Sequence, residues 1–119
     1  VVDDEIVNRV VASKHLENLG LEVDQAVGGK DCVAKFKEQK YDLIIMDLQM
    51  PELDGFEATE EIRQLEQESG QKEVPILALS ASILGTIWER CELVGMNGYL
   101  GKPFRSEELK QKLQELMSP

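Results

Sequence analysis

Short apolar runs alternate along the chain with stretches of helical periodicity. The run from Leu43 to Met46 is continuous and apolar, which is typical of a parallel strand buried on both faces. A second run, Ile76 to Leu79, follows Pro75 and has the same character. Between such runs, apolar residues recur at intervals of three and four, which predicts amphipathic helices. We therefore expect strands and helices to alternate from one end of the chain to the other.

Five strands and five helices account for this pattern. The strands are expected at 1–2, 21–24, 43–46, 76–79 and 98–100. The helices carry apolar stripes at Ala12, Leu16 and Leu19, at Val33 and Phe36, at Ala58, Ile62 and Leu65, at Leu84, Ile87, Cys91 and Val94, and at Leu109, Leu113 and Leu116. Ser106 is the expected N-cap of the last helix. This alternation predicts a parallel sheet with helices on both faces, that is, a doubly wound α/β fold.

The carboxyl ends of the predicted strands are followed by chemically capable residues. Asp3 and Asp4 follow the first strand, Asp47 the third and Ser80 the fourth, and Lys102 comes soon after the fifth. Any one of these aspartates alone is more simply a turn former or a helix cap. Working sites of such folds lie at the carboxyl ends of the strands, so the five residues together predict one site.

This set of residues suits a magnesium-dependent phosphoryl site. Clustered carboxylates repel one another unless a cation offsets their charge, and Mg²⁺ prefers such oxygen ligands. A lysine and a hydroxyl opposite the metal would hold a phosphoryl group. Asp47 is the expected nucleophile, because it ends the most buried strand. Pro51 and Gly55 would shape the loop after it, with Gly55 at a positive φ and the loop's carbonyl oxygens available as further ligands.

Composition narrows the class of partner. The formal net charge is −10, which argues against non-specific binding to nucleic acid or to anionic lipid. No run is long and apolar enough to span a membrane. Cys32 and Cys91 fall on apolar helix positions and are expected to be reduced core residues of a cytosolic protein. The chain starts at Val1 without a methionine, so we expect an excised fragment with a clipped first strand.

Four motifs at these strand ends carry a family resemblance. They read VVDD at the start, MDLQMPELDGFEATEEIR in the middle, ALSA at 78–81 and GYLGKPF near the end. With them the chain resembles, over residues 1–119, the receiver domain of two-component response regulators, most closely those of hybrid histidine kinases. The resemblance implies one receiver domain with a flavodoxin-like, doubly wound parallel sheet of five strands in the order 2-1-3-4-5 and five helices.

The resemblance also implies roles at the site. Asp47 would accept a phosphoryl group from a phosphohistidine. Asp4 would bind Mg²⁺ directly, Asp3 would bind it largely through water, and the main-chain carbonyl of Gln49 would be a further ligand beside Asp47.

Other residues would respond to the phosphoryl group. Ser80 would hydrogen-bond one of its oxygens and Lys102 would pair with another. Tyr99 matches the family's switch aromatic, which moves inward with Ser80. A cis peptide bond is expected before Pro103.

The implied partner is a histidine kinase or a histidine phosphotransfer domain. His15 is the only histidine and is expected on a helix surface, so the donor histidine must lie on another protein or another part of this one. The module would catalyse only its own phosphotransfer and slow autodephosphorylation, in the cytoplasm, alone or within a membrane-anchored hybrid kinase. No contact with nucleic acid or membrane is expected of it. The fourth helix, fifth strand and fifth helix allow a weak homodimer.

Two other functions compete with this one. A phosphatase of the haloacid dehalogenase type also uses an aspartate nucleophile with Mg²⁺ and a lysine. It needs a second aspartate two residues further on as its general acid, and Gln49 cannot donate a proton in that role. A degenerate receiver that serves only for docking is the third reading, and the intact set of site residues argues against it.

Overall fold

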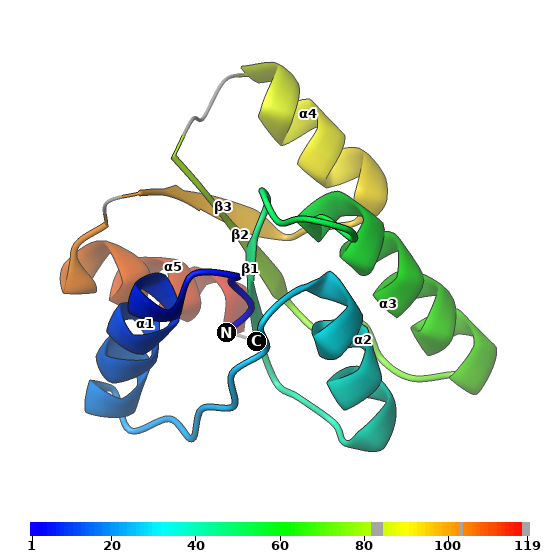
Figure 1. Ribbon diagram of the computed structural model, residues 1–119, viewed down its shortest axis with the longest axis horizontal. Helices are drawn as coiled ribbons and strands as arrows, with labels where there is room; N and C mark the ends of the chain where they lie inside the picture. Colours follow the sequence, from blue (N-terminus) through cyan, green and yellow to red (C-terminus); the bar gives the residue numbers. More distant parts are fainter. Residues whose placement is uncertain (82–84, 103, 118–119) are drawn as a thin grey trace.

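From α2 onward helices and parallel strands alternate along the chain, as the computed structural model shows for the residues it describes, 1–81, 85–102 and 104–117 (Figure 1). The elements are α1 (Ile6–Asn18), α2 (Gly29–Glu38), β1 (Ile44–Asp47), α3 (Gly55–Ser69), β2 (Ile76–Ser80), α4 (Gly85–Val94), β3 (Gly98–Gly101) and α5 (Ser106–Met117). Leu84, predicted on the fourth helix, and the cis bond predicted before Pro103 lie outside the described residues. The α/β alternation predicted from the sequence is confirmed.

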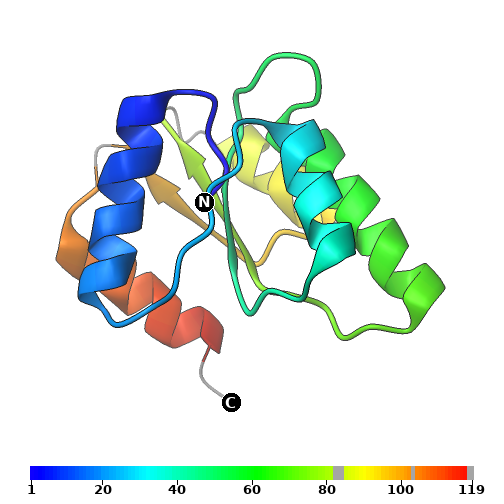
Figure 2. The ribbon, with the colours of Figure 1, turned by 60° about the horizontal axis from the view of Figure 1, so that its bottom comes forward.

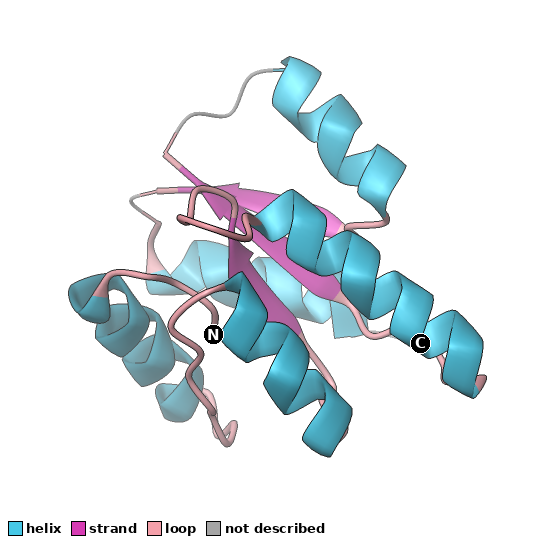
Figure 3. Cartoon of the chain, turned by 45° about the vertical axis from the view of Figure 1, so that its right-hand side comes forward, coloured by secondary structure: helices cyan, strands magenta, loops and turns pink. Residues whose placement is uncertain are grey.

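The sheet is parallel, with β1, β2 and β3 in that order (Figure 3). Val2 extends it beyond β1 by one isolated bridge to Met46 and another to Ala26. Reading across the sheet, the order is therefore Ala26, Val2, β1, β2, β3. This is the predicted order 2-1-3-4-5, with its first two members reduced to single bridges.

The predicted edge strand at residues 21–24 was wrong in position. These residues are described and are not in a strand, and the residue that pairs with Val2 is Ala26. Because the bridge between Val2 and Ala26 is parallel, its register would match residues 21–24 with positions before Val1. Leu21 and Val23 pack against the core on the α1 side of the sheet. The main chain of the segment also has contacts, because the carbonyl of Asp24 accepts from the amino group of Val1 at 2.9 Å.

Two apolar clusters cover the two faces of the sheet. On one face α2, α3 and α4 pack over alternate residues of β1 and β2, and on the other α1 and α5 do so (Figures 1 and 2). Met46 and Ala78 belong to the first cluster, whereas Ile45 and Leu77 belong to the second. All four are at most 2% exposed, so both faces of the central strands are buried, which explains why these strands read as continuous apolar runs.

Three helices are followed by a glycine in the left-handed conformation. Gly20 and Gly95 follow α1 and α4 with φ of 89° and 97°, in the left-handed conformation that glycine adopts at helix ends. The third helix, α3, continues past the apolar stripe that ends at Leu65 to Ser69 and stops at Gly70, where φ is 70°. The helix begins at Asp54, whose side chain forms a reciprocal capping box with Glu57.

The start of α5 differs from the sequence prediction. Arg105 caps the helix, because its carbonyl accepts from the N–H of Leu109, and Ser106 is the first helical residue. The Ser106 hydroxyl lies 2.6 Å from Nδ1 of His15 on α1, and the His15 ring packs on Phe104. His15 lies half-exposed on the surface of α1, and its side chain also joins this helix to the start of α5.

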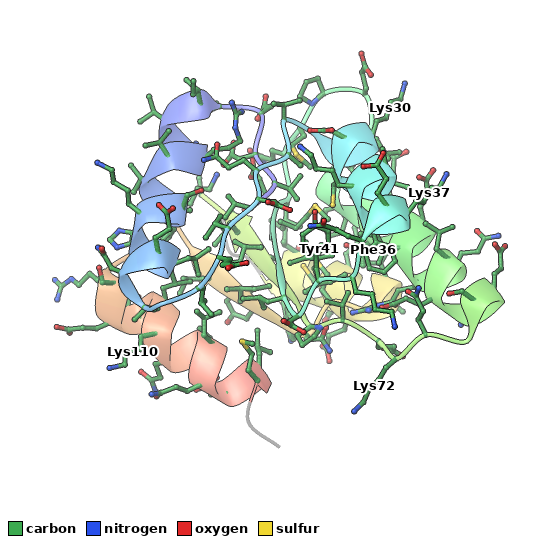
Figure 4. The ribbon with its side chains drawn as sticks, turned by 90° about the horizontal axis from the view of Figure 1, so that it is seen from below. Lys30, Phe36, Lys37, Tyr41, Lys72 and Lys110 are labelled. Atoms are coloured by element: carbon green, nitrogen blue, oxygen red, sulfur yellow. The ribbon has the colours of Figure 1, made fainter. Side chains whose placement is uncertain are left out.

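Two aromatic side chains pack against the fold, whereas four lysine side chains point away from it. Figure 4 shows Phe36 and Tyr41 lying between α2 and the sheet, while Lys30, Lys37, Lys72 and Lys110 point outward. Cys32 and Cys91 are buried and free, as predicted. Among the described residues, no helix has the length and apolarity needed to cross a bilayer.

Candidate functional site

The ends of the strands bring the predicted site residues together. Asp47 is the last residue of β1 and Ser80 the last of β2, and Lys102 directly follows β3. The Asp47 N–H donates to the carbonyl of Val2 at 2.9 Å, and the Lys102 N–H donates to that of Ser80 at 2.9 Å. Main-chain pairing of neighbouring strands therefore sets the relative positions of these side chains.

Lys102 lies between two aspartates. Its Nζ is 3.1 Å from Oδ2 of Asp3 and 3.3 Å from Oδ1 of Asp47. Both carboxylates are buried, at 1% and 6% exposed, so solvent screens these ion pairs weakly. Burial alone lowers the pKa of Lys102, but its hydrogen bond to Asp3 and the charge of Asp47 outweigh burial and raise that pKa.

Asp4 completes a cluster of three carboxylates. One oxygen from each of Asp3, Asp4 and Asp47 lies within 4.8 Å of the others, and Asp4 is the exposed member. Lys102 contacts two of the three, so the cluster keeps an excess of negative charge. Oxygen ligands of this kind, open to solvent on one side, fit a hydrated Mg²⁺.

Gln49, Ser80 and Tyr99 surround this cluster differently. The Gln49 N–H points back at Oδ1 of Asp47 at 3.4 Å, and its side chain is exposed. Ser80 is buried at the end of β2. Tyr99 lies on β3 with its ring 4.9 Å from that of Trp88 on α4, so it joins the sheet to that helix.

The pKa of Asp47 is raised. Burial is the largest cause, the charge of Lys102 opposes it, and the charge of Asp3 adds to it. The folded domain therefore resists ionising Asp47 more than the unfolded chain does.

This shift predicts that Asp47→Asn stabilises the metal-free domain at neutral pH. A raised folded pKa gives stability that is complete below the unfolded value of about 3.9 and is lost as pH rises through the folded value. At pH 7 the ionised Asp47 is thus unfavourable, and its replacement should raise Tm by a few degrees in a chelator. The gain should shrink towards zero near pH 4. Asp42→Asn, at the other end of β1, controls for the loss of one exposed charge, and a lower Tm for Asp47→Asn at pH 7 would contradict this reasoning.

The loop after Asp47 is closed by a glycine, for a reason the sequence did not reveal. Gly55 was predicted to need a positive φ, but the non-glycine residue with positive φ in this loop is Glu52, at 66°. The Gly55 N–H instead bonds the carbonyl of Leu48, and a Cβ at Gly55 would lie 2.5 Å from the carbonyl oxygen of Asp47. Glycine is needed there because α3 starts against the main chain of the site.

Arg9 is a residue near the site that sequence reasoning gave no role. Its Nη1 donates to the main-chain carbonyl of Asp3 at 2.8 Å. The sequence held one signal: Arg9 is a cation five residues after Asp4, at the start of the predicted helix, within reach of the acidic pair.

Comparisons with known proteins agree with this geometry. The model of the response regulator receiver domain family matches residues 1–114. Probable histidine kinase 4 of Oryza sativa subsp. japonica is 39% identical over 137 aligned positions, which cover 100% of this chain and 14% of that protein. The chain belongs to the response regulator receiver domain family. It spans only about a seventh of this much longer relative.

Solved structures of receiver domains have the same fold. The receiver domain of sensor histidine kinase PA1611 from Pseudomonas aeruginosa PAO1, described with a magnesium ion in its active-site cleft, is 40% identical and superposes with a TM-score of 0.85 over 99% of this chain and 94% of that one. The Saccharomyces cerevisiae receiver domain of Ssk1, solved with the histidine phosphotransfer protein Ypd1, is 34% identical with a TM-score of 0.90, over 97% and 84% of the two chains. These neighbours confirm the predicted flavodoxin-like fold and set aside the haloacid dehalogenase reading.

Proposed function

We propose that this domain is a phosphorylation-controlled module of a phosphorelay, in which Asp47 accepts a phosphoryl group from a phosphohistidine. The observation that supports this most is the buried Asp47 carboxylate at a strand end, 3.3 Å from Lys102 and beside two further carboxylates. In the transfer, the bond between histidine nitrogen and phosphorus breaks, and a bond forms between phosphorus and an Asp47 oxygen. The electron pair of the broken bond returns to the imidazole of the partner.

The other site residues would bind either Mg²⁺ or the oxygens of the phosphoryl group on Asp47. Asp3, Asp4, Asp47 and the carbonyl of Gln49 would hold Mg²⁺, which, when bound, offsets the negative charge of the carboxylates and of the phosphoryl oxygens. Lys102 would release its two carboxylates in part and pair with a phosphoryl oxygen. Ser80 would donate its hydroxyl to another.

We propose that the module catalyses only its own phosphorylation and slow dephosphorylation. Dephosphorylation would occur when water attacks phosphorus and the Asp47 carboxylate leaves. It would be slow because Gln49 stands where a phosphatase of the haloacid dehalogenase type has its general acid, and an amide cannot donate a proton in that role. The free, buried cysteines are compatible with the predicted cytoplasmic location, which stays a prediction.

The signal would pass through β2 and β3 to α4. Ser80 pairs in register with Gly101, and Tyr99 lies two residues before that position with its ring against Trp88. Phosphorylation would favour a different packing of this aromatic pair and so shift the population of the α4–β3–α5 face. A weak homodimer through that face stays a proposal on the same grounds.

The partner would dock on α1 beside the site. Ile6, Val7, Val10 and Val11 are 66%, 67%, 41% and 47% exposed, an unusual cluster of apolar side chains on one helix. The helix starts two residues after Asp4, so a protein covering it reaches the carboxylates. We propose a histidine phosphotransfer domain as the occupant, as in the yeast complex, where a receiver domain is bound to such a protein.

A charged substitution on α1 tests the docking proposal. Val7→Asp should slow phosphotransfer from a phosphorylated histidine phosphotransfer protein by about tenfold or more, because it introduces a desolvated charge at the interface. Phosphorylation by a small-molecule donor should stay unchanged. Leu93→Asp on α4, where the leucine is 87% exposed, is the matched control. Equal slowing by both variants, or by neither, would refute docking on α1.

The function itself is tested by phosphotransfer. The chain is mixed with Mg²⁺ and a labelled histidine phosphotransfer protein, and the label is followed by gel. We expect label on this chain within minutes and none on Asp47→Asn. If the label stayed on the donor at every Mg²⁺ concentration, phosphotransfer to Asp47 would be refuted. The chain would then be interpreted as a degenerate receiver that serves only for docking.

A further inference from the structure

Arg9 is the cation that holds the main chain at the acidic pair. We propose that it is a positioning residue: by bonding the carbonyl of Asp3 it orients Asp4 and so sets the affinity of the site for Mg²⁺. This inference rests on the proposed metal site and adds to it a residue outside the ligand set.

The main chain of Asp3 is at the end of the sheet. Its N–H donates to the carbonyl of Ala26 at 3.1 Å, which is the last ladder bond on that side of Val2. Its carbonyl accepts from Nη1 of Arg9 at 2.8 Å. The side chain of Arg9 therefore supplies a hydrogen bond to the Asp3 carbonyl where the main-chain pairing of the strand ends.

A hydrogen bond to the carbonyl of Asp3 also restricts the main chain of Asp4. The carbonyl of Asp3 and the N–H and Cα of Asp4 lie in one peptide plane, so a hydrogen bond to the oxygen orients the whole plane. The Asp3 side chain has separate holds, from the N–H of Glu5 at 3.0 Å and from Lys102 at 3.1 Å. Asp4 is exposed and lies outside both apolar clusters, so the position of its Cα, from which the carboxylate extends, depends on the plane that Arg9 holds.

A purely structural role explains Arg9 less well. Its Nε is buried with no hydrogen-bond partner among the described residues, as is the Oγ of Ser13 on the same helix. Arg9 differs from Ser13 because its Nη1 reaches the main chain of the acidic pair, where it bonds the carbonyl of Asp3. The position of Arg9 is therefore better explained by this bond than by packing.

The positive charge of Arg9 gives the positioning role and simple electrostatic repulsion opposite expected effects on Mg²⁺ binding. A positive charge near a cation site disfavours the cation, so electrostatics alone predict tighter Mg²⁺ binding when Arg9 is neutralised. Positioning predicts the opposite.

The test is calorimetric titration of MgCl₂ into the unphosphorylated chain, well below the Tm of each variant. Arg9→Met should weaken the Mg²⁺ Kd at least fivefold. Arg9→Lys, which keeps one donor, should fall between Arg9→Met and the unchanged chain. Lys14→Met removes an equal charge from an exposed position on the same helix and should change the Kd less than twofold.

The outcomes separate this inference from the proposed function. An unchanged or tighter Kd in Arg9→Met would overturn the role of Arg9, even if its Tm fell. If Arg9→Met does not fold, Arg9→Lys decides in the same way, since an unchanged Kd would refute positioning. If the unchanged chain showed no Mg²⁺ binding at millimolar concentrations, the metal site itself would be refuted.

Discussion

Replacing Lys102 by methionine is expected to reduce phosphorylation of the domain by at least about 100-fold, the usual effect of removing one preorganised donor from a charged transition state. Lys102 is the cation beside Asp47, 3.3 Å from its carboxylate and only one-fifth exposed. Phosphoryl oxygens arriving at Asp47 would bring more negative charge to a place where the carboxylates already repel one another. Without the ammonium group, Mg²⁺ alone would have to offset that charge.

Two further measurements make this result specific. Mg²⁺ binding should survive in Lys102→Met or become tighter, because a competing cation has been removed. Lys102→Arg should restore activity only in part, since a planar guanidinium does not reproduce the point charge of the ammonium. Lys72→Met, a change to a lysine that points outward, is the control for charge (Figure 4). Full phosphorylation of Lys102→Met would exclude Lys102 from the reaction.

Replacing Gly55 by alanine is expected to destabilise the domain by about 2 kcal/mol, in the range of overpacking in a closely packed core. The added Cβ would lie 2.5 Å from the carbonyl oxygen of Asp47 and 3.0 Å from the Cα of Leu48. Both are backbone atoms, so relief requires either α3 or the strand end to move. The same shift would displace Asp47, so phosphorylation should fall as well.

Gly28→Ala is the matched control for this change. Gly28 is in an extended conformation, with φ of 178°, and a Cβ there would meet nothing within 4 Å. We expect its free energy of unfolding to fall by less than about 1 kcal/mol, because Gly28 is the N-cap of α2 and alanine is a poorer N-cap than glycine. Urea denaturation of both variants measures the difference. Equal stability of the two would show that the loop can yield at Gly55.

Much of the fold could be predicted because its strongest signals are local. The runs at 43–46 and 76–79 are apolar throughout since both faces of β1 and β2 are covered. The strand expected at 21–24 is absent although its pattern alternates, because the same pattern suits an irregular segment whose Leu21 and Val23 side chains pack on the core. Its register depends on Val2, which is distant in sequence.

The site was predictable to the extent that it follows from strand ends. The meeting of Asp3, Asp47 and Lys102 could be predicted because parallel strands end at one edge, and the structure brings these three charged side chains together. Ser80 ends the neighbouring strand at the same edge. The role of Arg9 and the need for glycine at position 55 are tertiary contacts between a side chain or Cβ and a distant carbonyl. The bond between His15 and Ser106, 91 positions apart, is of the same kind. No pattern within one element encodes such contacts.

The most direct test of the central claim is the intact mass of the chain after incubation with Mg²⁺ and a small-molecule phosphodonor. The proposed function predicts a gain of one phosphoryl group that hydroxylamine removes, that a chelator prevents, and that Asp47→Asn lacks. A gain that persists in Asp47→Asn would contradict the assignment of the acceptor. No gain from this donor or from a phosphorylated histidine phosphotransfer protein, with the chain folded and Mg²⁺ bound, would contradict the switch.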